Sequence, residues 1–225
     1  HDCRILSLAL LLSSVFLYNS VGSIDDSAVQ TLSLVLNISK QIKVHADKDA
    51  SLEDLSQVFP SSFWWVVRDF TLQLVTPEGS PLTPDEYLES ALREPVVSSA
   101  ASEITVRELI RTCFRRRNCV TMVRPCQEEE MLQRMETMAS ADCLRPAFVE
   151  QMKNARTRIL QQVPELEFMG TPVSGHMLVV LAQGYVDAIN QGAAPVVMNS
   201  WDLIAESQAK DVLAECLDVV RSRLH

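Results

Sequence analysis

One short stretch decides the fold of this 225-residue chain, Phe63-Trp64-Trp65-Val66-Val67-Arg68-Asp69. Its first five residues are aromatic or β-branched, so both faces of the strand that they predict are apolar. A strand of this kind lies in the middle of a parallel sheet that helices cover on both faces. We therefore expect an α/β fold in which Arg68 and Asp69 follow the carboxyl end of a central strand.

Two further strands are expected, one on each side of this stretch along the chain. Residues 15–18 are apolar with β-branched and aromatic side chains, and residues 119–123 form a short apolar run before Arg124 and Pro125. Strands that alternate with helices form parallel sheets. Because three strands make a thin sheet, we expect half of an α/β domain with added helices.

Capping residues predict where the helices begin. Thr83 is followed by proline and, at the third position, by Glu86, which is typical of a helix N-terminus. Ser23 can cap a second helix in the same way, and residues 105–114 are expected to form a third. Residues 45–56 are polar and are expected to form a surface connection.

The second half of the chain is predicted to be mostly helical. Residues 177–189 are apolar nearly all round, which predicts a deeply buried helix. Two helical faces are expected to lie in the core, and their members are Met131, Leu132, Met135 and Met138; and Phe148, Met152, Ala155 and Ile159. A third set forms the apolar face of a last long helix, namely Trp201, Ala205, Ala209, Val212, Cys216 and Val220.

Composition excludes several classes of protein. The chain carries 20 Lys and Arg against 29 Asp and Glu, a net charge of −9, which argues against nonspecific binding to nucleic acid. Its six cysteines include no C-x-x-C pair and do not cluster with the four histidines, which argues against a zinc site and a disulfide scaffold. We expect reduced cysteines in a cytoplasmic protein.

The apolar run at residues 5–18 has two interpretations. It is short for a transmembrane helix, and the small residues after it resemble a signal-peptide cleavage site. The favoured interpretation is a buried helix that leads into a buried strand. The chain begins with His1 rather than Met, so we expect either a processed protein or a piece of a longer one.

Candidate ligand-binding residues follow the predicted strands, because parallel sheets bind ligands beyond the carboxyl ends of their strands. They are Asn19, Arg68 with Asp69, and Arg124 with Pro125. A carboxylate such as that of Asp69 can accept two hydrogen bonds from the N1 and N2 edge of guanine, and adenine offers a different pattern. The dipeptide by itself, however, favours a structural ion pair between Arg68 and Asp69.

The sequence contains no recognisable phosphate-binding loop. A P-loop needs G-x-x-x-x-G-K-[ST], and the nearest match, Gly170 to Gly175, contains Pro172 and continues with His176. The basic run at residues 115–117 is interpreted as a solvated turn before a strand, in preference to a phosphate patch.

Longer motifs resemble one family over nearly the whole chain. Residues 63–72, followed by PLTPDEYL at 81–88, resemble the guanine-recognition region of guanylate-binding proteins, which are large GTPases related to atlastins within the dynamin superfamily. This family uses an Arg-Asp pair where small GTPases carry an Asn-Lys-x-Asp motif. Other segments are similar to further parts of the same domain in the family's order, namely residues 11–22, 117–125, 148–152 and 184–195.

The resemblance implies roles for five residues. Asp69 would bind the base edge of guanine with Arg68 beside the base, and Val123, Arg124 and Pro125 would lie in a loop that caps the base. The family hydrolyses GTP with Mg²⁺, and dimerisation through the G domain accelerates hydrolysis. The implied partners are therefore GTP and GDP, a second copy of the parent protein and, by peripheral association, intracellular membranes.

The resemblance also implies that the chain is a fragment. The family's P-loop, switch threonine and D-x-E-G motif precede the matched region, so the Mg²⁺ ligands are expected outside this chain. We expect the C-terminal half of a P-loop GTPase (G) domain with a partial parallel sheet at residues 1–195, and the first helix of an all-α region at 196–225.

Two functional readings follow from this organisation. In the first, the parent protein is a GTPase and this chain, which supplies guanine recognition without the phosphate site, is inactive alone. The alternative is a degenerate, non-enzymatic interaction module of the same fold. In either case, a half sheet with an unpaired edge is expected to aggregate.

Overall fold

The computed structural model describes residues 2–33, 51–93, 105–133, 144–168 and 170–191, and scattered residues between 202 and 222. These residues form two compact units. The first unit draws its described residues from 14–33 and 60–164, and the second draws them from 1–13, 34–59 and 165–225. The candidate residues for ligand binding all belong to the first unit.

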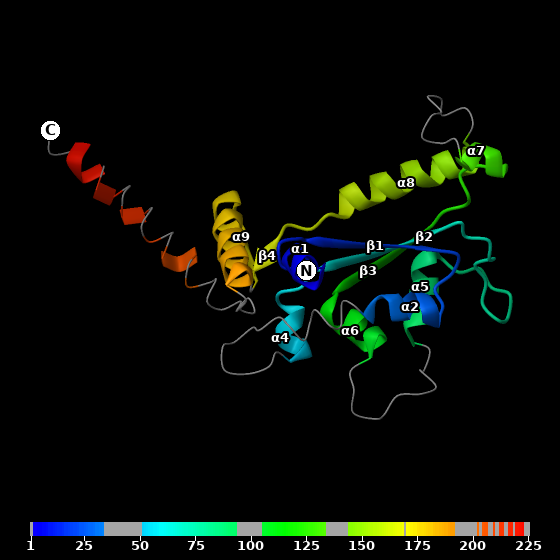
Figure 1. Ribbon diagram of the computed structural model, residues 1–225, viewed down its shortest axis with the longest axis horizontal. Helices are drawn as coiled ribbons and strands as arrows, with labels where there is room; N and C mark the ends of the chain where they lie inside the picture. The colour runs from blue at the N-terminus through cyan, green and yellow to red at the C-terminus, as the bar shows by residue number, and fades with distance from the viewer. Residues whose placement is uncertain are drawn as a thin grey trace. The chain divides into compact units, whose positions relative to one another are not determined.

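Three parallel strands form the centre of the first unit (Figure 1). They are β1 (Val15–Val21), β2 (Ser62–Arg68) and β3 (Arg116–Thr121), in the order β1-β2-β3. Trp65 of β2 is level with Tyr18 of β1 and with Cys119 of β3. The prediction of an α/β fold with a small parallel sheet around β2 is confirmed.

Helix α8 (Pro146–Gln162) covers one face of this sheet (Figure 1). Side chains alternate along a strand, and Trp64 of β2 points to this face, where it is fully buried against Val120 of β3 and Ala155 of α8. The same helix leaves Met152 44% exposed. The prediction that Met152 lies in the core is therefore wrong, because this position faces away from the sheet.

Helices α2, α5 and α6 cover the opposite face (Figure 1), and their bounds are Asp26–Thr31, Pro84–Arg93 and Val106–Cys113. Phe63 is fully buried on this face, and its ring centroid lies 5.2 Å from that of Phe114, the residue that ends α6. Arg107 of α6 joins the three helices, because it donates to the Ala91 carbonyl at 2.9 Å and pairs with Asp26 at 2.7 Å.

Capping residues fix the starts of α5 and α2. The predicted reciprocal pair at α5 is confirmed, since the Thr83 N–H donates to Glu86 Oε2 at 2.8 Å and the Glu86 N–H donates to Thr83 Oγ1 at 3.2 Å. Helix α2 is capped by Asp25, whose carboxylate accepts the Ala28 N–H at 2.8 Å. The prediction of Ser23 as the cap is wrong, because Asp25 is an equally good cap two residues further on.

The second unit is mainly helical. Its elements are α1 (Asp2–Leu11), α4 (Leu52–Ser56), the antiparallel strands β4 (Glu167–Phe168) and β5 (Thr171–Pro172), and α9 (Gly175–Asn190). Helix α1 contacts α9. The expected surface connection at 45–56 is wrong for its last part, because Ser51 and Asp54 form a capping box that starts α4. Residues 45–50 lie outside the described residues.

Helix α9 buries only one of its faces. Met177, Leu181 and Tyr185 are buried, whereas Val179 is 63% exposed. The prediction of burial all round is wrong, because apolar content does not determine how many neighbours a helix has. No helix among the described residues is long and apolar enough to span a bilayer.

Two of the predicted apolar faces are only partly described. Helix α7 (Glu129–Gln133) leaves Met131 half-buried, and Met135 and Met138 lie outside the described residues. The described residues from 202 to 222 are helical, but Val212 and Val220 are exposed in them. Neither face is confirmed as part of a core.

Candidate functional site

The carboxyl ends of β2 and β3 meet at one edge of the sheet, and Asp69 and residues 123–125 lie beyond them. Asn19, which was expected to follow the first strand, lies within β1 instead, because that strand continues to Val21. Arg68 is the last residue of β2, and residues 123–125 follow β3 after a single intervening residue, Met122. The Met122 N–H donates to the Val67 carbonyl at 2.8 Å, and the Phe70 N–H donates to the Met122 carbonyl at 2.9 Å. The segments that follow the two strands are therefore held side by side beyond the paired residues of β2 and β3.

Arg68 is bonded to β1 rather than to its neighbour in the sequence. Its Nε donates to Oδ1 of Asn19 at 2.8 Å, and its carbonyl accepts the Gly22 N–H at 2.8 Å. Among the described residues no ion pair joins Arg68 to Asp69. The interpretation of this dipeptide as a structural ion pair, which the sequence alone favours, is therefore not supported.

Asp69 has the backbone conformation that sets this site apart. Its φ is +53°, and among the described residues it is the only one other than glycine with a positive φ. The left-handed region costs an L-residue about 1 kcal/mol, and it is tolerated best by Asn and Asp. The peptide groups on both sides are held, because the Arg68 carbonyl bonds to Gly22 and the Phe70 N–H bonds to Met122. Strained residues that are held in this way cluster at ligand sites.

The Asp69 carboxylate keeps its hydrogen-bonding capacity. The residue is half-buried, and no donor from the described part of the chain bonds to its side chain. An ionised carboxylate has about four lone-pair sites and is a strong acceptor of N–H groups. The arrangement can therefore bind a ligand that presents two adjacent N–H donors.

The loop at residues 123–125 is anchored to α8 by its main chain. The Val123 N–H donates to Oε1 of Gln151 at 2.8 Å. The Pro125 carbonyl accepts the Arg145 N–H at 2.8 Å, and the Arg124 carbonyl lies 3.4 Å from Arg145 Nη1. Gln151 and Arg145 are not recognisable as site residues in the sequence, because nothing in a single sequence indicates that a helical glutamine bonds to a distant loop.

The charged group of Arg124 remains available. Its side chain is exposed, and its Nη2 lies 3.8 Å from Oε1 of Glu129, which is also exposed. An ion pair between exposed groups at this distance contributes little, about 0–1 kcal/mol. The guanidinium can therefore turn toward a ligand at the end of the sheet at small cost.

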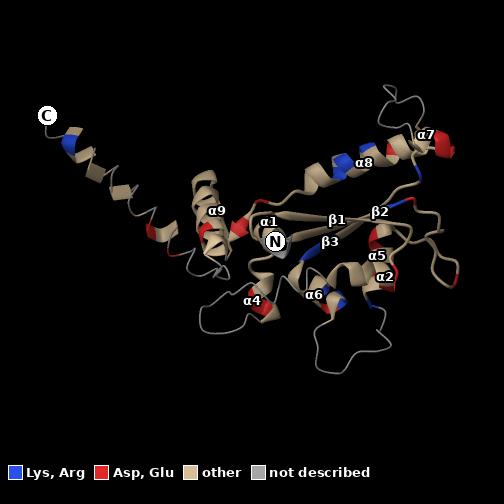
Figure 2. Ribbon diagram, in the orientation of Figure 1, with Lys and Arg blue, Asp and Glu red and all other residues tan. Residues whose placement is uncertain are grey.

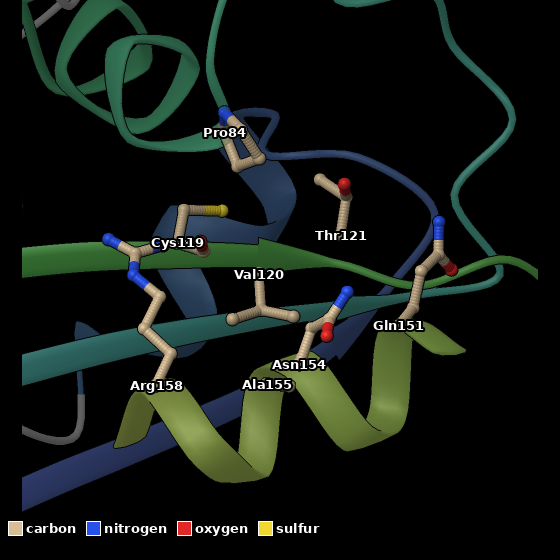
Figure 3. Close-up of a pocket in the computed structure, with 8 residues that line it drawn as sticks. All are labelled: Pro84, Cys119, Val120, Thr121, Gln151, Asn154, Ala155 and Arg158. Atoms are coloured by element: carbon tan, nitrogen blue, oxygen red, sulfur yellow. Dashed lines mark hydrogen bonds between the residues drawn. The ribbon is translucent and has the colours of Figure 1, made fainter. Parts of the chain in front are cut away.

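A shallow pocket lies beside this loop, between β3, α8 and the start of α5 (Figure 3). Its volume is about 160 Å³, and it is lined by Pro84, Cys119, Val120, Thr121, Gln151, Asn154, Ala155 and Arg158. Helix α8 carries several basic residues (Figure 2), and one of them, Arg158, pairs with Asp85 of α5 at 2.5 Å and donates to the Cys119 carbonyl of β3 at 3.3 Å. Burial, together with the nearby charge of Asp85, raises the pKa of the Cys119 thiol to about 12. The pocket therefore offers no reactive thiolate near neutral pH.

The other candidates from the sequence have structural roles or lie elsewhere. The prediction of a solvated turn at residues 115–117 is wrong for Arg116 and Arg117, because β3 already begins at Arg116. Arg117 pairs with Glu89 at 2.7 Å through Nε and donates from Nη1 to the carbonyls of Arg111 and Phe114, so these two nitrogens are used within the fold. The glycines at 170 and 175 flank β5 in the second unit and form no phosphate cradle with a lysine. Within the described ranges, no group of three His, Cys, Asp or Glu side chains could hold a metal ion.

Comparison with known proteins connects this arrangement to one family. The sequence matches the family described as "Guanylate-binding protein, N-terminal domain" over residues 1–165. It is 34% identical over 231 residues to guanylate-binding protein 7 of Mus musculus and 33% identical over 234 residues to guanylate-binding protein 6 of Homo sapiens, with 97% of this chain and 35% of each relative covered. It is 36% identical over 212 residues to guanylate-binding protein 2 of Mus musculus, with 92% of this chain and 36% of the relative covered.

The chain thus spans about one third of the length of these curated relatives. The matched region includes β1 to β3 and α8, and with them every residue of the candidate site. The family match covers well over half of the chain, and the chain belongs to the guanylate-binding protein family.

Proposed function

We propose that this chain forms the guanine-recognising part of a protein that binds and hydrolyses GTP. The observation that carries the proposal is the Asp69 carboxylate, which has no donor among the described residues and follows the central strand in a left-handed conformation. Membership of a family named for guanylate binding supports the choice of ligand. The bond from Arg68 to Asn19 supports it further, because the carboxylate is not neutralised by its neighbour.

Recognition follows from the hydrogen-bonding pattern of the base. Guanine presents N1–H and N2–H₂ side by side, and the two oxygens of Asp69 accept one hydrogen bond from each. Adenine places an acceptor at N1, so its binding would leave the carboxylate facing a lone pair at a cost of about 1–3 kcal/mol. In this proposal Arg68 packs beside the base, and residues 123–125 cover it.

Hydrolysis is proposed for the longer parent protein rather than for this chain. The described residues do not fit a magnesium site, and the 225 residues contain no P-loop motif. Bound Mg²⁺ would neutralise phosphate charge, and we propose that its ligands and the phosphate-binding residues lie outside this chain. Dimerisation through the G domain, a cytoplasmic location and peripheral attachment to intracellular membranes are proposed on the family resemblance alone.

Binding of nucleosides tests base recognition without a phosphate site. Saturation-transfer difference NMR on the 225-residue chain should detect guanosine at millimolar concentration and adenosine about tenfold more weakly, and Asp69→Ala should remove the difference. Equal binding of guanosine and adenosine by the wild-type chain would overturn the proposal in favour of a module that has lost nucleotide binding.

A second titration tests the assignment of the phosphate site. A fluorescent GTP analogue with Mg²⁺ should bind the isolated chain no more tightly than guanosine does, and no GTP should be hydrolysed. Micromolar, Mg²⁺-dependent binding or measurable turnover would show that the chain has a phosphate site of its own.

A further inference from the structure

Side chains of α5 and α8 accept hydrogen bonds from main-chain N–H groups on the outer side of β3 and of the loop that follows it. β3 is at one end of the described sheet, so every second N–H along it points away from β2. The Cys119 N–H donates to Oδ1 of Asp85 at 2.7 Å, and further along the Val123 N–H donates to Oε1 of Gln151 at 2.8 Å. The second of these bonds falls within the loop proposed to cover guanine.

Gln151 lies on a helix that is anchored in the core. It lies in the second turn of α8, and one turn later Ala155 is buried against Trp64 and Val120. Figure 3 shows the side chain of Gln151 rising from α8 toward β3 beside the pocket. Because the helix is fixed by its core residues, the position of the amide oxygen determines where the Val123 N–H can lie.

Two more bonds join the same helix to the same loop. Arg145, the residue before α8, donates its N–H to the Pro125 carbonyl at 2.8 Å, and its Nη1 lies 3.4 Å from the Arg124 carbonyl. Three consecutive loop residues are thus held by the start of α8. On the other side, the Met122 carbonyl accepts the N–H of Phe70, which directly follows Asp69.

We propose that Gln151 is a positioning residue for guanine recognition, which holds the main chain at Val123 so that residues 123–125 close over the base bound by Asp69. This inference rests on the proposed function of the loop. Gln151 contacts the loop and acts through it. Loss of its acceptor leaves the Val123 N–H unpaired, and the loop then moves to bond with water at the expense of its closed position.

Three variants separate this role from a general effect on folding. Gln151→Met has a similar length and volume but no strong acceptor, whereas Gln151→Glu keeps an oxygen at the same reach. Asn154→Met is the matched control, because Asn154 lies on the same helix, lines the same pocket and is exposed without a hydrogen bond among the described residues. Gln151→Ser, which is too short to reach Val123, replaces Gln151→Met should the latter not fold.

The readout is guanosine binding by the full 225-residue chain, measured by saturation-transfer difference NMR. Gln151→Met should weaken guanosine binding about fivefold, the factor carried by one hydrogen bond of average strength, while adenosine binding stays the same. Gln151→Glu and Asn154→Met should stay within about twofold of the wild type. Hydrogen exchange should become faster at the Val123 amide in Gln151→Met and stay unchanged at the Cys119 amide, which Asp85 holds.

The positioning role would be overturned if Gln151→Met bound guanosine as tightly as the wild type, or if Gln151→Glu lost as much guanosine affinity as Gln151→Met. Either result would leave the proposed role of Asp69 intact. Failure of the wild-type chain and of Asn154→Met to prefer guanosine would overturn the proposed function and this inference together. The two failures are therefore distinguished by the wild-type measurement.

Discussion

At the scale of single residues, Asp69 has two separable properties, a carboxylate and a left-handed backbone. Asp69→Gly removes the carboxylate and the strain together. The free energy of unfolding should change by less than about 0.5 kcal/mol, because relief of strain offsets the larger entropy of the unfolded chain. Guanosine selectivity should nevertheless be lost. Urea unfolding measures the effect on stability, and nucleoside titration measures the effect on selectivity. Selectivity that survives in Asp69→Gly would show that the carboxylate does not recognise guanine.

Asp69→Val also removes the carboxylate, but it increases the backbone strain that Asp69→Gly relieves. A β-branched side chain is disfavoured at a φ of +53°, so unfolding should require about 1–2 kcal/mol less than in the wild type. The loss of stability comes in addition to the loss of selectivity. A valine variant as stable as the wild type would show that the backbone at residue 69 is not constrained as described.

Two buried thiols make the free energy of unfolding depend on pH in the alkaline range. Burial raises the pKa of Cys113 and of Cys119 from 9.0 to about 12. Below about pH 8 both thiols are protonated in the folded and unfolded states, so they do not lower the stability of the fold. As the pH rises from 9 toward 12, the unfolded chain releases protons that the folded chain retains, and stability falls by on the order of 1 kcal/mol per thiol and pH unit.

Thermal melting between pH 8 and pH 10.5 measures this fall. The Cys119→Ala variant is less stable at pH 8, since it leaves a cavity, but its melting temperature should decline less steeply with pH. The same decline in both proteins would contradict the assignment to the thiol. Among the cysteines whose side chains are described, namely Cys113, Cys119, Cys126 and Cys216, none forms a disulfide.

At the scale of secondary-structure elements, Asp85 joins α5, β3 and α8. One of its carboxylate oxygens accepts the Cys119 N–H, and the other pairs with Arg158. Asp85→Ala leaves a main-chain N–H of β3 unpaired and should lower the free energy of unfolding by about 1–3 kcal/mol. Asp85→Asn keeps an acceptor and loses only a partly exposed ion pair, so it should cost about 1 kcal/mol or less. Equal losses in urea unfolding would show that the edge bond contributes nothing.

Elements with strong local signals could be predicted from the sequence. β2 was recognisable because its run of five aromatic and β-branched residues favours a strand buried on both faces, and α5 because Thr83 and Glu86 satisfy each other's main chain. The start of α2 was not, because Ser23 and Asp25 are equivalent caps in sequence and tertiary packing selects between them. The exposed faces of α8 and α9 depend on neighbours that periodicity does not reveal.

The candidate site was predictable in its location but not in its geometry. Parallel topology places Arg68, Asp69 and residues 123–125 at one edge of the sheet, as expected from the strand ends. The bond from Arg68 to Asn19 and the positive φ of Asp69 depend on how β1 and β3 hold the segment after β2. Roles in guanine binding remain a prediction for all five residues.

At the scale of the whole molecule, the two edges of the sheet differ. Side chains bond to the outer edge of β3, whereas no main-chain or side-chain group of the described residues bonds to the outer edge of β1. Leu17 of β1 is also 51% exposed. We expect the isolated chain to self-associate through β1, since an open apolar edge pairs with other strands.

Leu17→Lys tests this expectation, because an added charge on an edge strand opposes pairing between copies. Sedimentation velocity should show oligomers for the wild type and a larger share of monomer for Leu17→Lys. A wild-type chain that is monomeric and melts cooperatively would contradict the expectation and would indicate that the β1 edge is covered. The division into a partial G domain at 1–195 and a helical segment at 196–225 likewise stays a prediction.

The central claim is that the Asp69 carboxylate accepts hydrogen bonds from N1–H and N2–H₂ of guanine, and one substitution tests this claim most directly. Xanthine keeps the N1–H of guanine but carries a carbonyl at C2, so the amide of an Asp69→Asn variant can accept from N1–H and donate to the C2 oxygen. In competition between guanosine and xanthosine, measured by saturation-transfer difference NMR, the wild-type chain should prefer guanosine and Asp69→Asn should prefer xanthosine. An unchanged ratio of the two nucleosides in the variant would contradict the claim.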